Sequence, residues 1–177
     1  MTTTIDLSYP IGRFTPVEPG TADARLAAID DIAALPRHMR DAVAGLNDAQ
    51  LDTPYRPGGW TVRQLVHHVA DSHMNAFIRL KLALTEETPT IKPYDEKAWA
   101  GLPDARLPIE SSLAILDNLH ARWDAIYGAL APAHFDRAFF HPEMQKEVTV
   151  DLHTQIYGWH SKHHVAHVMA LRRREGW

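Results

Sequence analysis

Four histidines fall within nine residues of the stretch WHSKHHVAH, which runs from Trp159 to His167. On a helix, residues four apart lie on one face, one turn above the other. His160 and His164 have this spacing, so both imidazoles can reach one metal ion, as in the two-histidine helix motifs that bind zinc. His163 and His167 repeat the spacing. Two histidines alone make a weak site, so a third ligand has to come from another element.

The stretch LVHHVADSH offers that ligand, because it holds the adjacent residues His67 and His68. Val69 marks the centre of an apolar stripe, and on a helix His67 falls nearly opposite it, whereas His68 lies about 100° away at the edge of the stripe. We therefore expect His68 to point into the protein. Three imidazoles, with His160 and His164, would leave coordination positions of a metal open, which is typical of catalytic sites.

The remaining histidines are not interpreted as metal ligands. A single histidine on a helix is more often exposed, or buried with one hydrogen bond, than a ligand. We interpret five of them as structural residues, namely His73, His120, His134, His141 and His153. His163 is expected at the surface, and His167 is expected to support the face that carries His160 and His164.

Helical spacing of apolar residues predicts the elements that position these side chains. A first helix covers residues 21–46, with Pro36 kinking or splitting it. A capping box of Thr61 and Gln64 begins a second helix, which runs to about Thr85.

Two further helices follow along the chain. Large apolar residues at steps of three and four predict a helix within residues 113–130, and the last helix covers about 152–174. Between them, Phe140 and the alternation of Val148 and Val150 predict a short β-hairpin. Four amphipathic helices with long connectors indicate an all-α four-helix bundle.

Composition narrows the class of protein. The 177 residues are 45% apolar and 23% charged, which predicts one folded domain over 1–177, with 1–20 an irregular proline-rich arm. The net charge of -4 provides no basic field for nucleic acid. No signal peptide and no run of about 20 apolar residues is found, so we expect a cytoplasmic protein without a membrane partner.

The sequence contains no cysteine. No disulfide can therefore form, and no protein thiolate can act as a nucleophile or as a metal ligand. Any metal has to be held by nitrogen and oxygen atoms. Any sulfur chemistry has to use a thiol that arrives with a substrate.

Four segments, in order along almost the whole chain, resemble the YfiT branch of the DinB/YfiT superfamily. They are SYPIG, LDTPYRPGGWTVRQLVHHVADSHMN, RLKLALTEETPTIKPYDEKAW and WHSKHHVAH. The resemblance implies a four-helix bundle of the DinB/YfiT type, a homodimer, and one divalent ion per chain, nickel or zinc. In the family the second-helix ligand precedes an apolar-Ala-Asp run, here at residues 69–71, which selects His68 over His67. The other two ligands match His160 and His164.

The resemblance also implies an enzyme. The family is described as metal-dependent hydrolases, and better-defined relatives transfer low-molecular-weight thiols such as bacillithiol to electrophiles. A divalent ion can lower the pKa of bound water to about 7, or hold a thiol as the reactive thiolate. We expect a metal-dependent thiol transferase acting on a small-molecule thiol and an electrophile. A metal-dependent hydrolase is the first alternative, and a non-catalytic metal-binding protein is the second.

A hydrolase would need a general base near the metal. Asp71 lies on the side of its helix turned away from the stripe, and Glu86 and Glu87 lie far along the same helix. This lack favours the thiol transferase. Carboxylates in loops can still fold back toward the ion, namely those of Asp95, Glu96 and Asp136.

Aromatic and basic residues each allow two interpretations. An apolar electrophile could be bound by Trp60, Tyr94, Trp99 and Trp159, although such side chains as often fill a core. The carboxylates of an acidic thiol could be bound by Arg56, Arg63, Arg79 and Lys81, although such charges as often form a solvated helix face.

Overall fold

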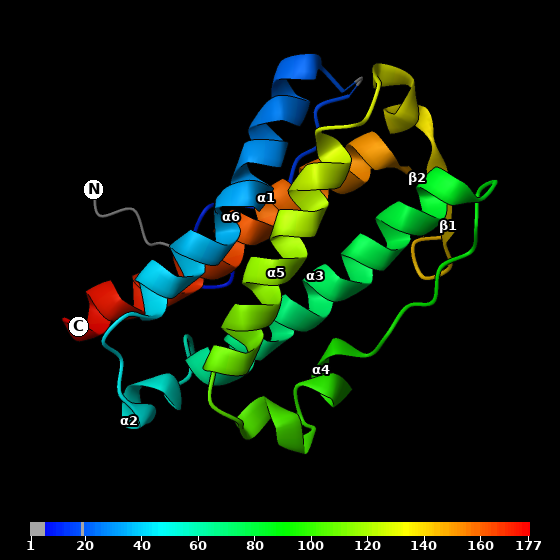
Figure 1. Ribbon diagram of the computed structural model, residues 1–177. Helices are drawn as coiled ribbons and strands as arrows, with labels where there is room; N and C mark the ends of the chain where they lie inside the picture. The colour runs from blue at the N-terminus through cyan, green and yellow to red at the C-terminus, as the bar shows by residue number, and fades with distance from the viewer. Residues whose placement is uncertain (1–5, 19) are drawn as a thin grey trace.

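Four long helices build the protein, and Figure 1 shows them side by side as a bundle. They are α1 (Ala22–Val43), α3 (Val62–Thr85), α5 (Glu110–Tyr127) and α6 (Val150–Glu175). The computed structural model describes residues 6–18 and 20–177. The connections hold the short helices α2 (Asp48–Leu51) and α4 (Glu96–Trp99), the 3-10 helices η1 (Pro103–Arg106) and η2 (Pro132–Asp136), and the strands β1 (Ala138–His141) and β2 (Lys146–Thr149). The predicted all-α four-helix bundle with a hairpin before the last helix is confirmed.

Threonine caps set the beginnings of three long helices. The Thr21 hydroxyl accepts a hydrogen bond from the Ala24 backbone N–H, and Thr149 caps α6 in the same way. That cap explains why α6 begins at Val150, two residues before the expected start. Pro36 lies inside α1 without splitting it, since α1 is one continuous helix.

The hairpin fixes the long connector that follows α3. Strands β1 and β2 are antiparallel, and Phe139 pairs with Val148 with both side chains buried. The connector joins the outer side of β1, where the Phe140 N–H donates to the Pro89 carbonyl at 2.9 Å and the Ile91 N–H donates to the Phe140 carbonyl at 3.1 Å. The short helix α4 lies just beyond this anchored segment.

The core consists of two apolar clusters along the bundle axis. The first cluster joins the first half of α3 to α1, α5 and α6, and includes Leu35, Met39, Leu65, Val69, Leu116 and Val168. The second cluster surrounds the second half of α3, and includes Ile32, Ala76, Leu80, Trp123, Phe139 and Tyr157. Histidines from α3, α5 and α6 lie between the two clusters. We call these residues the histidine layer, which consists of His73, His120, His160 and His164.

An irregular arm lies along α6. Among the described residues 6–18 and 20 no helix or strand forms, as expected, and residues 1–5 and 19 lie outside the described part of the chain. The Trp159 indole N–H donates to the Gly12 carbonyl at 3.3 Å, and the Val17 N–H donates to the Gln155 side chain at 2.9 Å. The arm therefore covers one face of α6.

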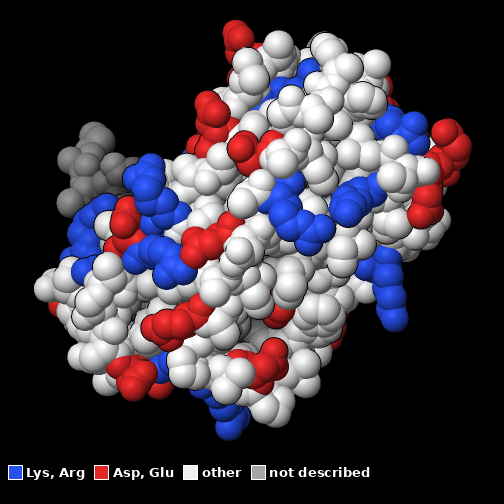
Figure 2. All heavy atoms as spheres, in the orientation of Figure 1, with Lys and Arg blue, Asp and Glu red and all other residues white. Residues whose placement is uncertain are grey.

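Charge is distributed without a dominant patch on the face in Figure 2, where positive and negative side chains are interspersed. No helix within residues 6–18 and 20–177 combines the length and the apolar character that a membrane span requires.

Helices α1 and α6 approach most closely at Gly158. A Cβ atom built on Gly158 would lie 2.8 Å from both the Cα and the Cβ of Ala28. Real Cβ contacts are longer, so any side chain at this position would push the two helices apart. Glycine at 158 is therefore a packing requirement, in a helix interior where alanine is intrinsically preferred.

We expect Gly158→Ala to lower the free energy of unfolding by about 1–3 kcal/mol, because overpacking outweighs the roughly 1 kcal/mol gained in helix propensity. Gly128→Ala is the matched control, since Gly128 has φ -62 and its added Cβ would meet only ordinary contacts, the nearest at 3.5 Å. That control should be neutral or stabilised by about 0.4–1 kcal/mol. Urea denaturation measures both, and equal stability of the two variants would contradict the packing argument.

Candidate metal centre

Three imidazoles converge inside the bundle. His68 comes from α3, and His160 and His164 come from neighbouring turns of α6. One ring nitrogen of each lies within 4.8 Å of the other two, and the His160 and His164 Nε2 atoms are 3.1 Å apart. In the part of the chain that the structure describes, no other group of three histidines or carboxylates converges in this way.

The donor set fits a divalent ion. Burial lowers the pKa of His68 to about 4, and burial, followed by the neighbouring imidazoles, holds the pKa values of His160 and His164 well below the ordinary range. The rings are therefore neutral at pH 7, which is the form that binds metals. A spacing of 3.1 Å suits two nitrogens that share an ion at about 2.1 Å each. His68 and His164 are buried but His160 is half-buried, so the cluster meets solvent beside His160.

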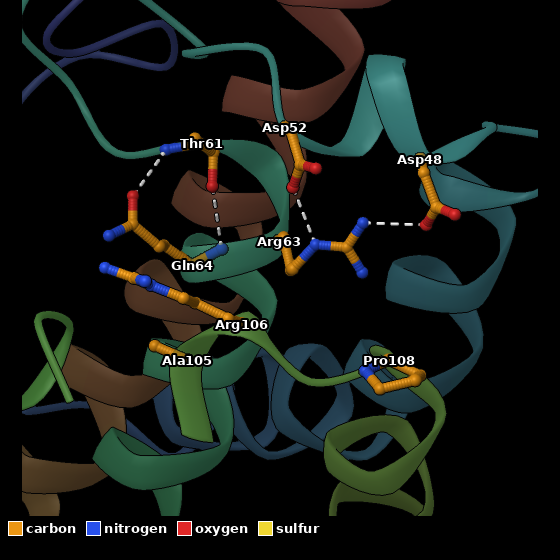
Figure 3. A pocket seen from close by; sticks show the side chains of 8 residues that line it. All are labelled: Asp48, Asp52, Thr61, Arg63, Gln64, Ala105, Arg106 and Pro108. Carbon is orange, nitrogen blue, oxygen red and sulfur yellow. Dashed lines mark hydrogen bonds and ion pairs between the residues drawn. The ribbon is translucent and has the colours of Figure 1, made fainter. Parts of the chain in front are cut away.

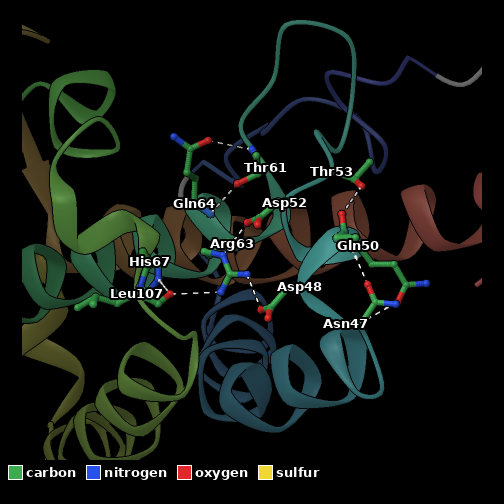
Figure 4. Close-up of polar contacts among 11 residues, drawn as sticks. Asn47, Asp48, Gln50, Asp52, Thr53, Thr61, Arg63, Gln64, His67 and Leu107 are labelled. Atoms are coloured by element: carbon green, nitrogen blue, oxygen red, sulfur yellow. Dashed lines mark hydrogen bonds and ion pairs between the residues drawn. The ribbon is translucent and has the colours of Figure 1, made fainter.

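The beginning of α3 is fixed by polar contacts that hold His68 in place. The predicted capping box is present, with the Gln64 N–H donating to the Thr61 hydroxyl at 3.1 Å and the Thr61 N–H donating to the Gln64 side chain at 3.0 Å (Figure 3). The Arg63 guanidinium donates to Asp52 at 2.6 Å and to Asp48 at 2.8 Å, which ties α2 to α3 (Figure 4). Arg63 is thus committed to two aspartates, and the suggestion that it binds a substrate carboxylate is wrong.

A cavity of about 630 Å³ lies over this network. It is lined by Asp48, Asp52, Thr61, Arg63, Gln64, Ala105, Arg106 and Pro108 (Figure 3). None of the three clustered histidines lines it. The cavity is therefore separate from the candidate metal centre.

His67 corrects one expectation, because it is buried although it lies opposite the apolar stripe of α3. Its Nε2–H donates to the Leu107 carbonyl at 3.0 Å, and its Nδ1 accepts from the Ser112 hydroxyl at 2.7 Å (Figure 4). The connector before α5 covers this face of α3, so the first half of the helix is enclosed on both sides. His67 therefore contacts the connector and α5, whereas His68 faces His160 and His164.

His163 corrects a second expectation, because it is buried and not at the surface. Trp159 stacks on its ring at a centroid distance of 4.3 Å, and Tyr9 of the arm lies 5.9 Å away. Its Nε2 lies 3.0 Å from that of His167, which packs against Tyr55. Trp159 therefore packs between the arm and His163, and no third ligand joins this pair among the described residues.

His73 lies directly beside the centre, where the sequence suggested a structural residue, a neighbour of the ligands or a dimer contact. Its Nε2 lies 3.1 Å from Nδ1 of His160, and the ring is fully buried. The sequence carried a signal for this position, because His73 comes four residues after Val69 and so lies close to the centre of the buried stripe. His120 and His153 are buried as core residues, whereas His134 is exposed and His141 is half-buried.

Hydroxyl groups line the side of the centre next to His160. The Tyr157 ring lies 5.3 Å from that of His160, and its hydroxyl is 3.3 Å from the Ser72 hydroxyl. The connector after α3 places Tyr94 here, and burial, with a smaller effect of Glu96, raises the pKa of its phenol. The Tyr94 hydroxyl is buried without a hydrogen-bond partner among the described residues, so it is available to a bound molecule.

The carboxylates considered from the sequence do not join the cluster. Asp95 caps α4 by accepting from the Ala98 N–H at 2.9 Å, and Asp136 ends η2. Asp71 is half-buried, and burial, then the nearby Asp104, raises its pKa. Glu96 lies nearer the hydroxyl groups, and burial raises its pKa as well.

Comparison with known proteins agrees with the fold. Residues 31–168 match the DinB superfamily. YfiT of Bacillus subtilis is 49% identical over 176 residues, 99% of each chain, and a relative from Bacillus mycoides is 51% identical over 172 residues, 97% of this chain and 99% of the relative. Both relatives are named putative metal-dependent hydrolases. The solved structure of YfiT, described as a probable metal-dependent hydrolase with an unusual four-helix bundle topology, has a TM-score of 0.93 and covers 97% of this chain and 98% of its own.

Buried histidines make the stability of the fold depend on pH. Burial lowers the pKa of His153 to about 3, whereas the same side chain titrates near 6.5 when unfolded. Between these values the unfolded chain binds the extra proton, so the free energy of unfolding falls as the pH drops below about 6.5. We expect His153→Leu to reduce the slope of unfolding free energy against pH by about one proton, or about 1.4 kcal/mol per pH unit.

Denaturant titrations of the metal-free protein at several pH values between about 4.5 and 6 test this expectation. His38→Gln is the control for the substitution of a histidine as such, because His38 is exposed. A wild-type slope in His153→Leu would contradict the prediction.

Proposed function

The chain belongs to the DinB superfamily, and we propose that it is a metal-dependent transferase that joins a low-molecular-weight thiol of the bacillithiol type to an electrophile. One divalent ion per chain, nickel or zinc, would be held by His68, His160 and His164. The observation that carries the proposal is the cluster of three neutral imidazoles that no carboxylate joins among the described residues. Relatives named as metal-dependent hydrolases support a metal-dependent enzyme.

The absence of a carboxylate from the cluster, among the described residues, favours a thiol over water as the nucleophile. A bound divalent ion supplies Lewis acidity, which lowers the pKa of a thiol or of water. A free thiol has a pKa of about 8.5 and bulk water about 15.7, so a thiol needs far less help to ionise at neutral pH. With no cysteine in the chain, that thiol has to belong to a substrate.

Residues around the cluster have defined tasks in this proposal. Trp60 covers His68 at a centroid distance of 4.5 Å and excludes water from that side. Tyr94 and Ser72 would donate hydrogen bonds to the electrophile. Burial sets the direction of the pKa shifts of His153 and Tyr157, and the nearby positive charge of Arg79 makes a smaller contribution to both. Arg79 forms no ion pair with the described residues and would attract a carboxylate of an acidic thiol.

A metal-dependent hydrolase is the second candidate, and the names of the relatives favour it. The candidate for its general base is Glu96, because its charge acts on Tyr94 and Tyr157 beside the cluster. The homodimer implied by the family stays a prediction.

We expect wild-type protein reconstituted with zinc or nickel to hold one ion per chain, and His164→Ala to lose it, because two imidazoles make a weak site. Elemental analysis after desalting measures the content. His160→Ala provides an independent variant at a less buried position, and the exposed His38→Gln is the control. Full metal content in both ligand variants would rule out this ligand set.

We expect the metal-loaded protein to consume an aromatic halide only when a low-molecular-weight thiol is present, and the metal-free protein to be inactive. A panel of thiols and esters, followed by absorbance, distinguishes the candidates. Glu96→Gln should retain thiol transfer within about 3-fold, whereas loss of a general base would slow ester hydrolysis by about 100-fold or more. Ester hydrolysis without any thiol, lost in Glu96→Gln but kept in the exposed control Glu87→Gln, would favour the hydrolase.

A further inference from the structure

Behind the candidate metal centre, four contacting residues contain five buried nitrogen atoms without a partner among the described residues. These atoms are His73 Nδ1, His120 Nε2, Trp123 Nε1, and both ring nitrogens of His153. Ring centroids of His73 and His120 are 5.0 Å apart, and those of Trp123 lie 5.7 and 5.6 Å from them. Nearly all buried polar groups in native proteins are paired, with protein or with ordered water. This concentration indicates a ligand for these atoms.

The backbone of α1 fixes the proton on His120. Its Nδ1 lies 2.8 Å from the Ile32 carbonyl, which can only accept a hydrogen bond. His120 therefore carries its proton on Nδ1. In the neutral ring, Nε2 is then an acceptor, and this is the unpartnered atom.

The metal centre fixes the proton on His73 in the same way, and this step rests on the proposed function. The Nε2 of His160 faces the cluster, at 3.1 Å from His164 Nε2, so its Nδ1 carries the proton and donates to His73 Nε2 at 3.1 Å. His73 then accepts at Nε2 and has its own proton on Nδ1. That atom is a buried donor without a partner.

A donor on His73 and an acceptor on His120 thus remain on two rings stacked at 26°. We propose that one internal water molecule accepts from His73 Nδ1–H and donates to His120 Nε2, and that this relay makes His73 the positioning residue for the ligand His160. In this arrangement the water has two protein partners, within the two to four that buried waters usually have. The relay connects the Ile32 carbonyl to the metal ligand through side chains that are fully or almost fully buried.

The proton positions can be measured directly in the wild-type protein loaded with zinc. Two-bond ¹H–¹⁵N correlation spectra report the tautomer of each imidazole. We expect the Nδ1–H tautomer for His120, His73 and His160. The Nε2–H tautomer at His73 would overturn the relay, and so would a high-resolution crystal structure of the zinc-loaded protein without a water between His73 and His120.

Substitution of His73 tests positioning through metal affinity. We expect His73→Leu to weaken zinc binding by about 10- to 100-fold and to shift the visible spectrum of the cobalt-loaded protein. His73→Gln should recover affinity to within about 3-fold, because its amide oxygen can accept from His160 Nδ1–H. His153→Leu is the matched control, since His153 is equally buried but has no hydrogen bond to a ligand, and it should bind zinc as the wild type does.

The outcomes separate the two proposals. If the wild-type protein binds zinc and His73→Leu keeps both the wild-type affinity and the wild-type cobalt spectrum, the relay is wrong and the metal centre stands. If the wild-type protein binds none of zinc, nickel and cobalt, the proposed function fails and the relay fails with it. If His73→Leu does not fold, the tautomer of His73 in the wild-type protein decides.

Discussion

The rest of the structure depends on the burial of uncharged imidazoles between two apolar clusters. Apolar packing on either side, by residues such as Leu116 and Trp123 of α5, removes water from the histidine layer. Without water the protonated form of each ring is disfavoured, so its lone pair remains available. The same exclusion makes every unpaired nitrogen costly, which constrains the atoms placed around the rings. The proposed metal ion and the proposed internal water would each provide partners for some of these nitrogens.

Rigid elements hold this layer in register. The close contact of Gly158 with Ala28 holds α6 against α1, two residues before His160. The capping box and the Arg63 network fix the beginning of α3, less than two turns before His68. Ligands on such anchored helices do not depend on loops for their positions. The connector that carries Tyr94 is in turn held by β1, so the hydroxyl groups face a prebuilt centre.

Much of this arrangement could be predicted from the sequence, and the failures have one cause. Spacing of four residues placed His160 and His164 on one face, and the apolar stripe placed His68 at an inward edge. The periodicity of apolar residues, however, indicates only one buried face of a helix. Both α3 and α6 are buried on two faces. The connector over His67 and the arm over His163 have no periodic signal, so both histidines were assigned to the wrong environment. His73 lay on the buried stripe, but spacing could not show which atom it would meet.

The order of the elements along the chain has a consequence for synthesis in the cell. Two of the three clustered rings belong to α6, which is made after α1, α3 and α5. Until α6 has been synthesised, His68 is the one histidine of this cluster that the nascent chain contains. Binding of the proposed ion would therefore have to wait until α6 docks on the other helices, and an incomplete chain could not hold the ion in this cluster.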